Sequence, residues 1–265
     1  MGARPRSRTR PEAADGNGAP LLEARDLATA PESGGLRGVG LRVRRGEAVA
    51  LFGPGARTVV AVLAGRVPLS GGAILLHGAE QPRGIGVGHS IGPAPARAGT
   101  RTVEEHLAGR ARLRGGDPRS AAAVLDVFPM LRARARSPLG ALTDGEHRLL
   151  GLAEALLSRP ELLLIDGLTP GLAGPHLDAL PVLVRRLLGA GAAAVIAEPV
   201  IPVALAAGTR ACVLGDGRIT AEFTAPRPAS IAESLRAVRP PASGRAHDGT
   251  GREPAANPSD DKQEE

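Results

Sequence analysis

The sequence predicts an α/β fold, with a mixed sheet flanked by helices. Three short apolar runs, at 48–52, 162–165 and 192–197, are typical of strands buried on both faces, and a helical pattern follows each of them. Such alternation of strands and helices indicates a largely parallel sheet. Two segments near the start, 21–27 and 36–43, alternate apolar and polar residues and predict half-buried strands.

Turn residues and helix signals place the other elements. A helix over 58–64 is expected behind the first apolar strand, and Gly65 closes it. Thr102 and Glu105 have the spacing of a capping box, which predicts that a helix begins there. Further helices are expected at 119–128, 176–188 and 201–207, further strands at 73–76, 84–87, 212–214 and 218–223, and a loop rich in glycine and proline at 91–100.

The stretch 142–173 carries the most informative sequence pattern of the chain. A polar turn at 142–146 opens a helical run, and Pro160 follows its end because proline cannot continue a helix. The strand 162–165 then leads directly into Asp166. A carboxylate at the carboxyl end of a buried strand lies where open α/β sheets bind ligands, so Asp166 is a candidate site residue.

This stretch resembles the signature-to-Walker-B region of ABC transporter ATP-binding subunits. The family writes LSGGEQQ, a helix, four apolar residues and Asp-Glu, and Asp166 lies at the family spacing, 24 residues after Leu142. The resemblance covers about 21–218 and looks closest to the branched-chain amino-acid type of subunit. It implies a P-loop NTPase-like sheet with an antiparallel β portion, inside a nucleotide-binding domain over 21–238 that carries a helical subdomain at about 100–158.

The turn after the first apolar strand is the candidate phosphate loop. It is two residues shorter than the pattern G-x-x-x-x-G-K-[ST], and the only lysine of the chain is Lys262. An unbroken helix puts Ala56 in the lysine place, whereas Arg57 could take that place only with a deletion that rotates the apolar face by about 100°. We favour the first alignment, in which Arg57 and Thr58 fall at the hydroxyl positions and no cation faces the phosphates. A plain strand–turn–helix connector is the other interpretation. The candidate nucleotide-binding residues are Gly53, Pro54, Gly55, Ala56, Arg57 and Thr58.

The resemblance also implies roles for Asp166 and for the signature residues. In the family the aspartate holds Mg²⁺ through water and a glutamate follows it, but here Gly167 follows, so no catalytic residue is predicted. Asp166 is either a remnant of a metal site or a capping or solvated carboxylate. Thr143, Asp144 and Gly145 would meet phosphate across a dimer interface. The charge of Asp144 would repel it, by about 1 kcal/mol per charge pair at 4 Å in water and about 4 at an effective dielectric of 20.

Further departures from the family pattern weaken the expected nucleotide chemistry. Pro199 stands at the place of the switch histidine, and Glu154 stands where the family usually carries arginine. The glutamine of the family's Q-loop has no counterpart, because Gln81 precedes the predicted strand at 84–87 instead of following it. No aromatic residue lies between Leu27 and Leu36 to stack on adenine. Binding of ATP and Mg²⁺ is therefore expected to be weak.

Composition bounds the remaining classes. The chain has 265 residues with 43% hydrophobic residues, and no apolar run is long enough to span a bilayer, which favours a cytoplasmic protein. Its net charge of +6 comes from arginines spread along the chain, without a recognition motif and with almost no aromatics, so a nucleic-acid partner is not expected. Cys212 is expected to be a buried thiol. The Arg-rich segment 1–20 and the segment 239–265 are predicted to be disordered tails.

The sequence thus predicts a degenerate, hydrolysis-deficient ABC transporter ATP-binding subunit. Its expected partners are a second ABC ATPase subunit, in a homo- or heterodimer, and a transporter membrane protein at the cytoplasmic face of the membrane. Two other functions remain open: an active ABC ATPase with non-standard site residues, and a regulatory or interaction protein without a role in transport.

Overall fold

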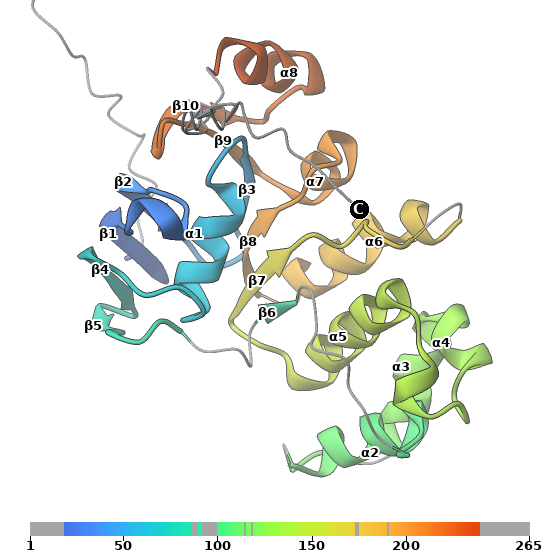
Figure 1. Ribbon diagram of the computed structural model, residues 1–265. Coiled ribbons are helices and arrows are strands. Elements are labelled where there is room, and N and C mark those ends of the chain that lie inside the picture. Colours follow the sequence, from blue (N-terminus) through green and yellow to red (C-terminus); the bar gives the residue numbers. More distant parts are fainter. Residues whose placement is uncertain are drawn as a thin grey trace, which may run out of the picture.

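A computed structural model describes residues 19–85, 90–91, 100–113, 115–117, 119–172, 175–189 and 191–238. Two sheets and a helical insert make up this part of the chain (Figure 1). The predicted tails lie outside the described residues, apart from Ala19 and Pro20, as do His89 and most of the predicted loop at 91–100. Among the described residues, no helix has the length and apolar character needed to cross a membrane.

The larger sheet has six strands in the order β10-β9-β3-β8-β7-β6. The three predicted apolar runs are its adjacent strands β3, β8 and β7. Strands β9, β3, β8, β7 and β6 run parallel, and β10 pairs antiparallel with β9 after a turn at 216–217. Every residue of β3, β8 and β7 is buried. The strands are β3 (Ala48–Phe52), β6 (Ser90–Ile91), β7 (Leu162–Asp166), β8 (Ala193–Ala197), β9 (Arg210–Gly215) and β10 (Arg218–Thr224).

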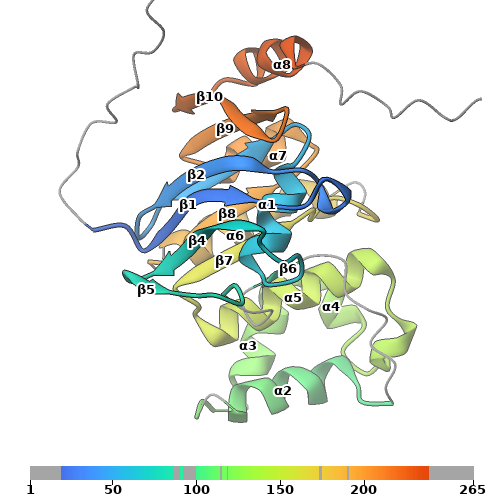
Figure 2. The same ribbon diagram turned by 60° about the vertical axis from the view of Figure 1, so that its left-hand side comes forward.

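The smaller sheet is antiparallel, in the order β2-β1-β4-β5, and confirms the expected antiparallel portion. Helix α1 (Ala56–Leu63) lies between the two sheets (Figure 2). Its valines and Leu63 share one apolar core with residues of both sheets, such as Leu22 and Leu164. The strands are β1 (Leu22–Ala28), β2 (Arg37–Val43), β4 (Gly71–Leu76) and β5 (Ala79–Glu80), with a short 3-10 helix η1 (Pro31–Ser33) before β2.

The other face of the larger sheet is covered by α5 and α6, and the helical insert packs beyond them (Figure 1). Alternation along β7 divides the two cores, because Leu162 and Leu164 face α1 whereas Leu163 and Ile165 face the helices. The helices are α2 (Val103–Leu113), α3 (Ser120–Val127), α4 (Pro129–Ala133), α5 (Asp144–Ser158), α6 (Pro175–Gly189), α7 (Ile201–Ala207) and α8 (Pro228–Ala237), with a 3-10 turn η3 (Leu139–Ala141).

The predicted strand at 84–87 is wrong in its described half. Ile85 donates its N–H to the carbonyl of Leu63 at 2.7 Å, so the segment packs against the end of α1 instead of joining a sheet. Gly84 has a φ of +76° and approaches Gly65 so closely that a Cβ would lie 2.4 Å from the Gly65 nitrogen. The edge strand β6, a few residues further on, pairs with β7 on the side away from β8, with Ser90 opposite Leu164.

Candidate functional site

The candidate phosphate loop is a tight turn at the carboxyl end of β3. Gly53 and Gly55 have φ of +87° and +93°, in the left-handed region that favours glycine. A Cβ on Gly53 would lie 2.3 Å from the carbonyl oxygen of Leu214, which excludes other residues there. The N–H of Ala56 donates to Gly53 O at 3.2 Å, and Pro54 has no N–H. The short loop therefore has fewer free donors for phosphate than its length suggests.

Asp166 ends β7 on the face that α1 covers. Its carboxylate is 7% exposed, and each of its oxygens accepts a hydrogen bond from a different arginine. Arg57 Nε lies 2.6 Å from Oδ1, and Arg66 Nη2 lies 3.2 Å from Oδ2. Asp166 is thus neither the capping carboxylate nor the solvated carboxylate that the sequence left open, because two guanidinium groups hold it.

Arg57 is the more exposed of the two arginines, since 67% of its side chain is open to solvent. Its hydrogen bond to Asp166, and then the charge of Asp166, raise the pKa of Arg57 above its ordinary value, with a smaller contribution from Glu198. The guanidinium is therefore a permanent positive charge in this site. Thr58, the next residue, points elsewhere, because its side chain packs against Gly34 beside η1.

Glu198 is a site residue that the sequence did not single out. It follows β8, is 3% exposed, and stands immediately before Pro199. Its carboxylate accepts hydrogen bonds from the N–H groups of Leu168 at 2.7 Å and Val200 at 3.1 Å, and from the N–H and hydroxyl of Thr169. These bonds fix the turn after Gly167. The sequence signal for it is a glutamate directly after the apolar run that forms β8.

The signature residues begin α5. Thr143 is the N-cap, and with Glu146 it forms a reciprocal capping box, in which each side chain accepts from the other residue's N–H, at 3.2 and 2.8 Å. Asp144 is exposed in the first turn, where a negative charge favours the helix. Gly145 is buried against the turn after β7, and a Cβ there would lie 2.4 Å from Gly171 O. Arg148 donates to Pro170 O at 2.7 Å, which ties the same turn to α5.

Glu154 also has a structural explanation. It is 6% exposed in α5, and its carboxylate accepts from His106 Nε2 at 2.9 Å and lies 3.1 Å from Arg110 Nη2. Both partners come from α2, so the charge that departs from the family pattern joins α5 to the helical insert. Pro199, at the predicted place of the switch histidine, follows Glu198 at the end of β8.

The comparisons with known proteins agree with this architecture. The sequence matches the ABC transporter family over residues 36–169. The chain belongs to that family. It is 32% identical over 200 residues to the high-affinity branched-chain amino acid transport ATP-binding protein BraG of Pseudomonas aeruginosa, covering 71% of this chain and 86% of the relative. It is 38% identical over 184 residues to the cytochrome c biogenesis ATP-binding export protein CcmA of Paracoccus denitrificans, covering 67% of this chain and 81% of the relative.

A solved structure supports the same assignment. An ATP-binding subunit of an ABC transporter superposes with a TM-score of 0.67 at 26% identity, covering 82% of this chain and 94% of that chain. The fold is therefore the α/β fold of an ABC cassette, with an antiparallel β portion and a helical insert, as the sequence predicted.

ATP and Mg²⁺ are the ligands that this family binds, and the residues present fit them unequally. Asp166 does not fit Mg²⁺, because both of its oxygens are bonded to arginines. A unit charge about 4 Å from another interacts with it by about 4 kcal/mol at an effective dielectric of 20, and a dication beside two arginines would be repelled accordingly. Within the described ranges, no group of three or more His, Cys, Asp or Glu residues is arranged to hold a metal.

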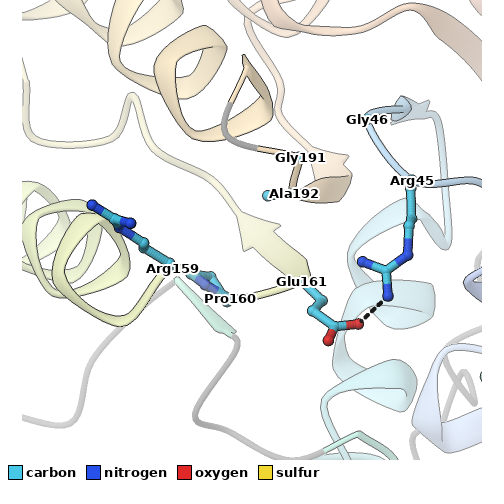
Figure 3. A pocket seen from close by; sticks show the side chains of 7 residues that line it. All are labelled: Arg45, Gly46, Arg159, Pro160, Glu161, Gly191 and Ala192. Atoms are coloured by element: carbon cyan, nitrogen blue, oxygen red, sulfur yellow. Dashed lines mark hydrogen bonds and ion pairs between the residues drawn. The ribbon is translucent and has the colours of Figure 1, made fainter. Parts of the chain in front are cut away.

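Two pockets in the described residues lie at the opposite edge of the sheet. One of about 340 Å³ is lined by Arg45, Pro160 and Gly191 among others, and Glu161 in it accepts from Arg45 at 2.9 Å (Figure 3). The other, also about 340 Å³, shares Glu161 and adds His77. Both lie where β7 begins, whereas Asp166 lies where it ends, so neither pocket belongs to the candidate nucleotide site.

Proposed function

We propose that this ABC transporter ATP-binding subunit does not hydrolyse ATP at its own loop site and acts beside an intact ATPase subunit. The observation that carries the proposal is the double pairing of Asp166 with Arg57 and Arg66. Gly167 adds to it, because the position after Asp166 has no side chain that could polarise water. Loss of a general base alone lowers the rate by about 10²–10⁴-fold.

The proposed assembly is a dimer of ATP-binding subunits joined to a transporter membrane protein at the cytoplasmic face of the membrane. A solved ATP-binding cassette at 18% identity is described as dimeric, and another is described as part of a transporter complex. Those descriptions apply to those proteins, and family membership extends the arrangement to this chain as a proposal. In such a dimer the turn at Thr143, Asp144 and Gly145 would face the partner's loop site, with Thr143 and Asp144 exposed and Gly145 buried behind them.

The branched-chain amino-acid type is our proposal for the lineage. Similarity to BraG extends over 86% of that protein and 71% of this chain, which supports a common architecture over most of the cassette. The test is reconstitution with the membrane proteins encoded beside the chain, where leucine, isoleucine or valine uptake is expected. Uptake of an unrelated solute, with none of these three, contradicts the lineage and leaves the subunit's role intact.

The hydrolysis deficiency is tested by steady-state phosphate release from the purified chain. Turnover is expected at the level of a blank, and Asp166→Ala is expected to leave it there. Circular dichroism of both proteins checks that they are folded. Turnover that Asp166→Ala abolishes in a folded protein contradicts the proposal and favours an active ATPase with non-standard residues.

The partner is tested by affinity capture of the tagged chain from its native host. The proposal expects co-purification of a second ABC ATPase chain that carries the lysine and glutamate missing here, together with a membrane protein. Recovery of the chain alone, or only with soluble proteins unrelated to transport, contradicts it and favours a regulatory role.

A further inference from the structure

The Asp166 carboxylate is surrounded by the protein's own cations. Arg57 reaches it from the start of α1, and Arg66 reaches it from beyond the end of the same helix. Only 7% of its side chain is exposed, and both of its oxygens already accept from a guanidinium group. The positive charge that a divalent ion supplies in a nucleotide site is therefore already present as a guanidinium.

We propose that Arg57 takes the place of the divalent cation, so that the loop site binds a metal-free nucleoside triphosphate. The inference rests on the proposed function, because it assigns a ligand to the loop site that does not hydrolyse. It differs from the family pattern in the identity of the ion: a fixed side chain bridges the aspartate and the phosphates in place of a metal.

The geometry of Arg57 suits this role. Its Nε is committed to Asp166, and within the described part of the chain its two terminal nitrogens have no protein acceptor. The side chain is 67% exposed and stands in the first turn of α1, next to the turn at 53–56. A guanidinium presents its donors in a planar fork that matches two phosphate oxygens. The N–H groups of a first helical turn are additional donors to an anion.

Arg66 supports the arrangement from the buried side. Its side chain is 30% exposed, and its bond to Oδ2 leaves the opposite oxygen to Arg57. Asp166 thus orients Arg57. When a phosphate also binds Arg57, the charge of Arg66 still balances the charge of Asp166. Mg²⁺ bound to the triphosphate would compete with Arg57 for the same oxygens, so the metal complex is expected to bind no better than the free anion.

The first measurement is a calorimetric titration of the full chain with ATP, once in EDTA and once in excess Mg²⁺. We expect the metal-free affinity to equal or exceed the affinity in Mg²⁺. Binding that Mg²⁺ strengthens tenfold or more overturns the inference, and so does the absence of metal-free binding at millimolar ATP.

Variants assign the effect to the side chain. Arg57→Ser is expected to weaken metal-free binding by about tenfold or more, which is the effect of losing a charge-assisted contact. Arg45→Ser is the matched control, because it removes the same charge from the exposed pair with Glu161 at the opposite edge of the sheet (Figure 3). Equal metal-free affinities in Arg57→Ser and wild type overturn the inference. Arg57→Lys keeps the charge and serves as a second variant if Arg57→Ser does not fold.

A metal readout completes the test without nucleotide or turnover. We compare the binding of added Mn²⁺ to the wild-type chain and to Asp166→Asn by electron paramagnetic resonance. We expect the two proteins to bind the same amount of Mn²⁺. A Mn²⁺ site that depends on Asp166 overturns the inference. These outcomes are separate from partner capture and phosphate release, so the loop site can fail to bind metal-free ATP while the proposed role beside an intact subunit stands.

Discussion

At the scale of single residues, the hydroxyl of Thr143 holds the first turn of α5. It accepts from Glu146 N at 3.2 Å, and loss of such a cap destabilises a protein by about 1 kcal/mol. We expect Thr143→Ala to lower the free energy of unfolding by about that amount in urea titrations, whereas Thr143→Ser keeps the oxygen and stays within a few tenths of wild type. Equal losses in both variants would assign the effect to the methyl group and contradict the role of the cap.

The charge of Glu146 adds a pH dependence to the same box. Burial raises the pKa of Glu146, but hydrogen bonds from Thr143 and the Arg134 guanidinium outweigh it and leave the pKa below the ordinary 4.5. A carboxyl whose pKa is lower in the folded state stabilises the fold above the unfolded pKa, and this contribution disappears as pH falls through the folded value.

The corresponding variant is Glu146→Gln, which keeps the capping geometry without the charge. We expect it to be less stable than wild type by up to about 1 kcal/mol at pH 7, because its partner Arg134 is 47% exposed. The difference should shrink towards zero as the pH falls below 4.5. A difference that is constant from pH 7 to pH 3 would contradict the assignment of the charge.

The position of Asp166 could be derived from the sequence, but its partners could not. Successive residues of a strand face opposite sides, so a residue two positions after Leu164 faces the same core, which α1 covers. Whether Arg57 contacts Asp166 depends on the shortened turn before α1. Whether Arg66 contacts Asp166 depends on the course of the backbone after Gly65. No local pattern encodes these tertiary distances, and the same holds for the four hydrogen bonds of Glu198.

At the scale of elements, the start of α5 and the turn after β7 pack with almost no space between them. A Cβ on Gly145 would lie 2.4 Å from Gly171 O, whereas one on Gly189, near the end of α6, would meet nothing within 4 Å. Forcing a methyl into a packed contact destabilises by about 1–3 kcal/mol. We expect this loss for Gly145→Ala in thermal or urea unfolding, and none for Gly189→Ala. Equal stabilities of the two variants would mean that the turn moves away freely.

Strand β9 buries the only cysteine. Cys212 is 0% exposed, and burial in the sheet raises the pKa of its thiol to about 12. Because the thiolate is the reactive form, we expect no labelling by iodoacetamide at pH 8 in the folded protein and rapid labelling in guanidinium. Rapid labelling of the native protein would contradict the placement of this thiol in the core.

Elements that are delimited by local sequence patterns could be predicted accurately, and elements that depend on tertiary contacts could not. The strand at 48–52 and the helix at 201–207 were predicted with the observed bounds, since apolar runs and turn residues delimit them. In its described half the predicted strand at 84–87 is wrong, because Gly84 and Ile85 pack against the end of α1, a contact that the sequence pattern does not contain. The capping box at Thr143 and Glu146 has the same spacing as the box predicted at Thr102 and Glu105, so the sequence alone contains its signal.

At the scale of the whole molecule, the substitutions at the site leave the two cores intact. Residues of β3, β7 and β8 are buried throughout, and burial of apolar area is what stabilises a domain. The charges that depart from the family pattern are each paired or exposed: Glu154 bonds to α2, and Asp144 faces solvent. The chain therefore keeps the buried framework of an ABC cassette despite these departures at the candidate site.

In a dimer of ATP-binding subunits, the partner's loop site would face this chain's signature. In the proposed dimer this chain would contribute Thr143, Asp144 and Gly145 to that site, and the negative charge of Asp144 would oppose phosphate binding there. We expect Asp144→Gly to raise the partner's kcat/KM for ATP. Removing about 1 kcal/mol of repulsion corresponds to about a fivefold increase. The same change removes a favourable charge from the first turn of α5, so a small loss of stability is expected with it.

The matched variant in the other site is Gly167→Glu, which restores the family's glutamate beside Asp166. We expect no increase in turnover, because Asp166 remains bonded to Arg57 and Arg66. The backbone opposes the change as well, since Gly167 has a φ of +70°, which costs other residues about 1–2 kcal/mol. Phosphate release from the co-purified pair carrying each substitution decides the matter. Activation by Gly167→Glu with no effect of Asp144→Gly would reverse the assignment and make this chain's own loop the working site.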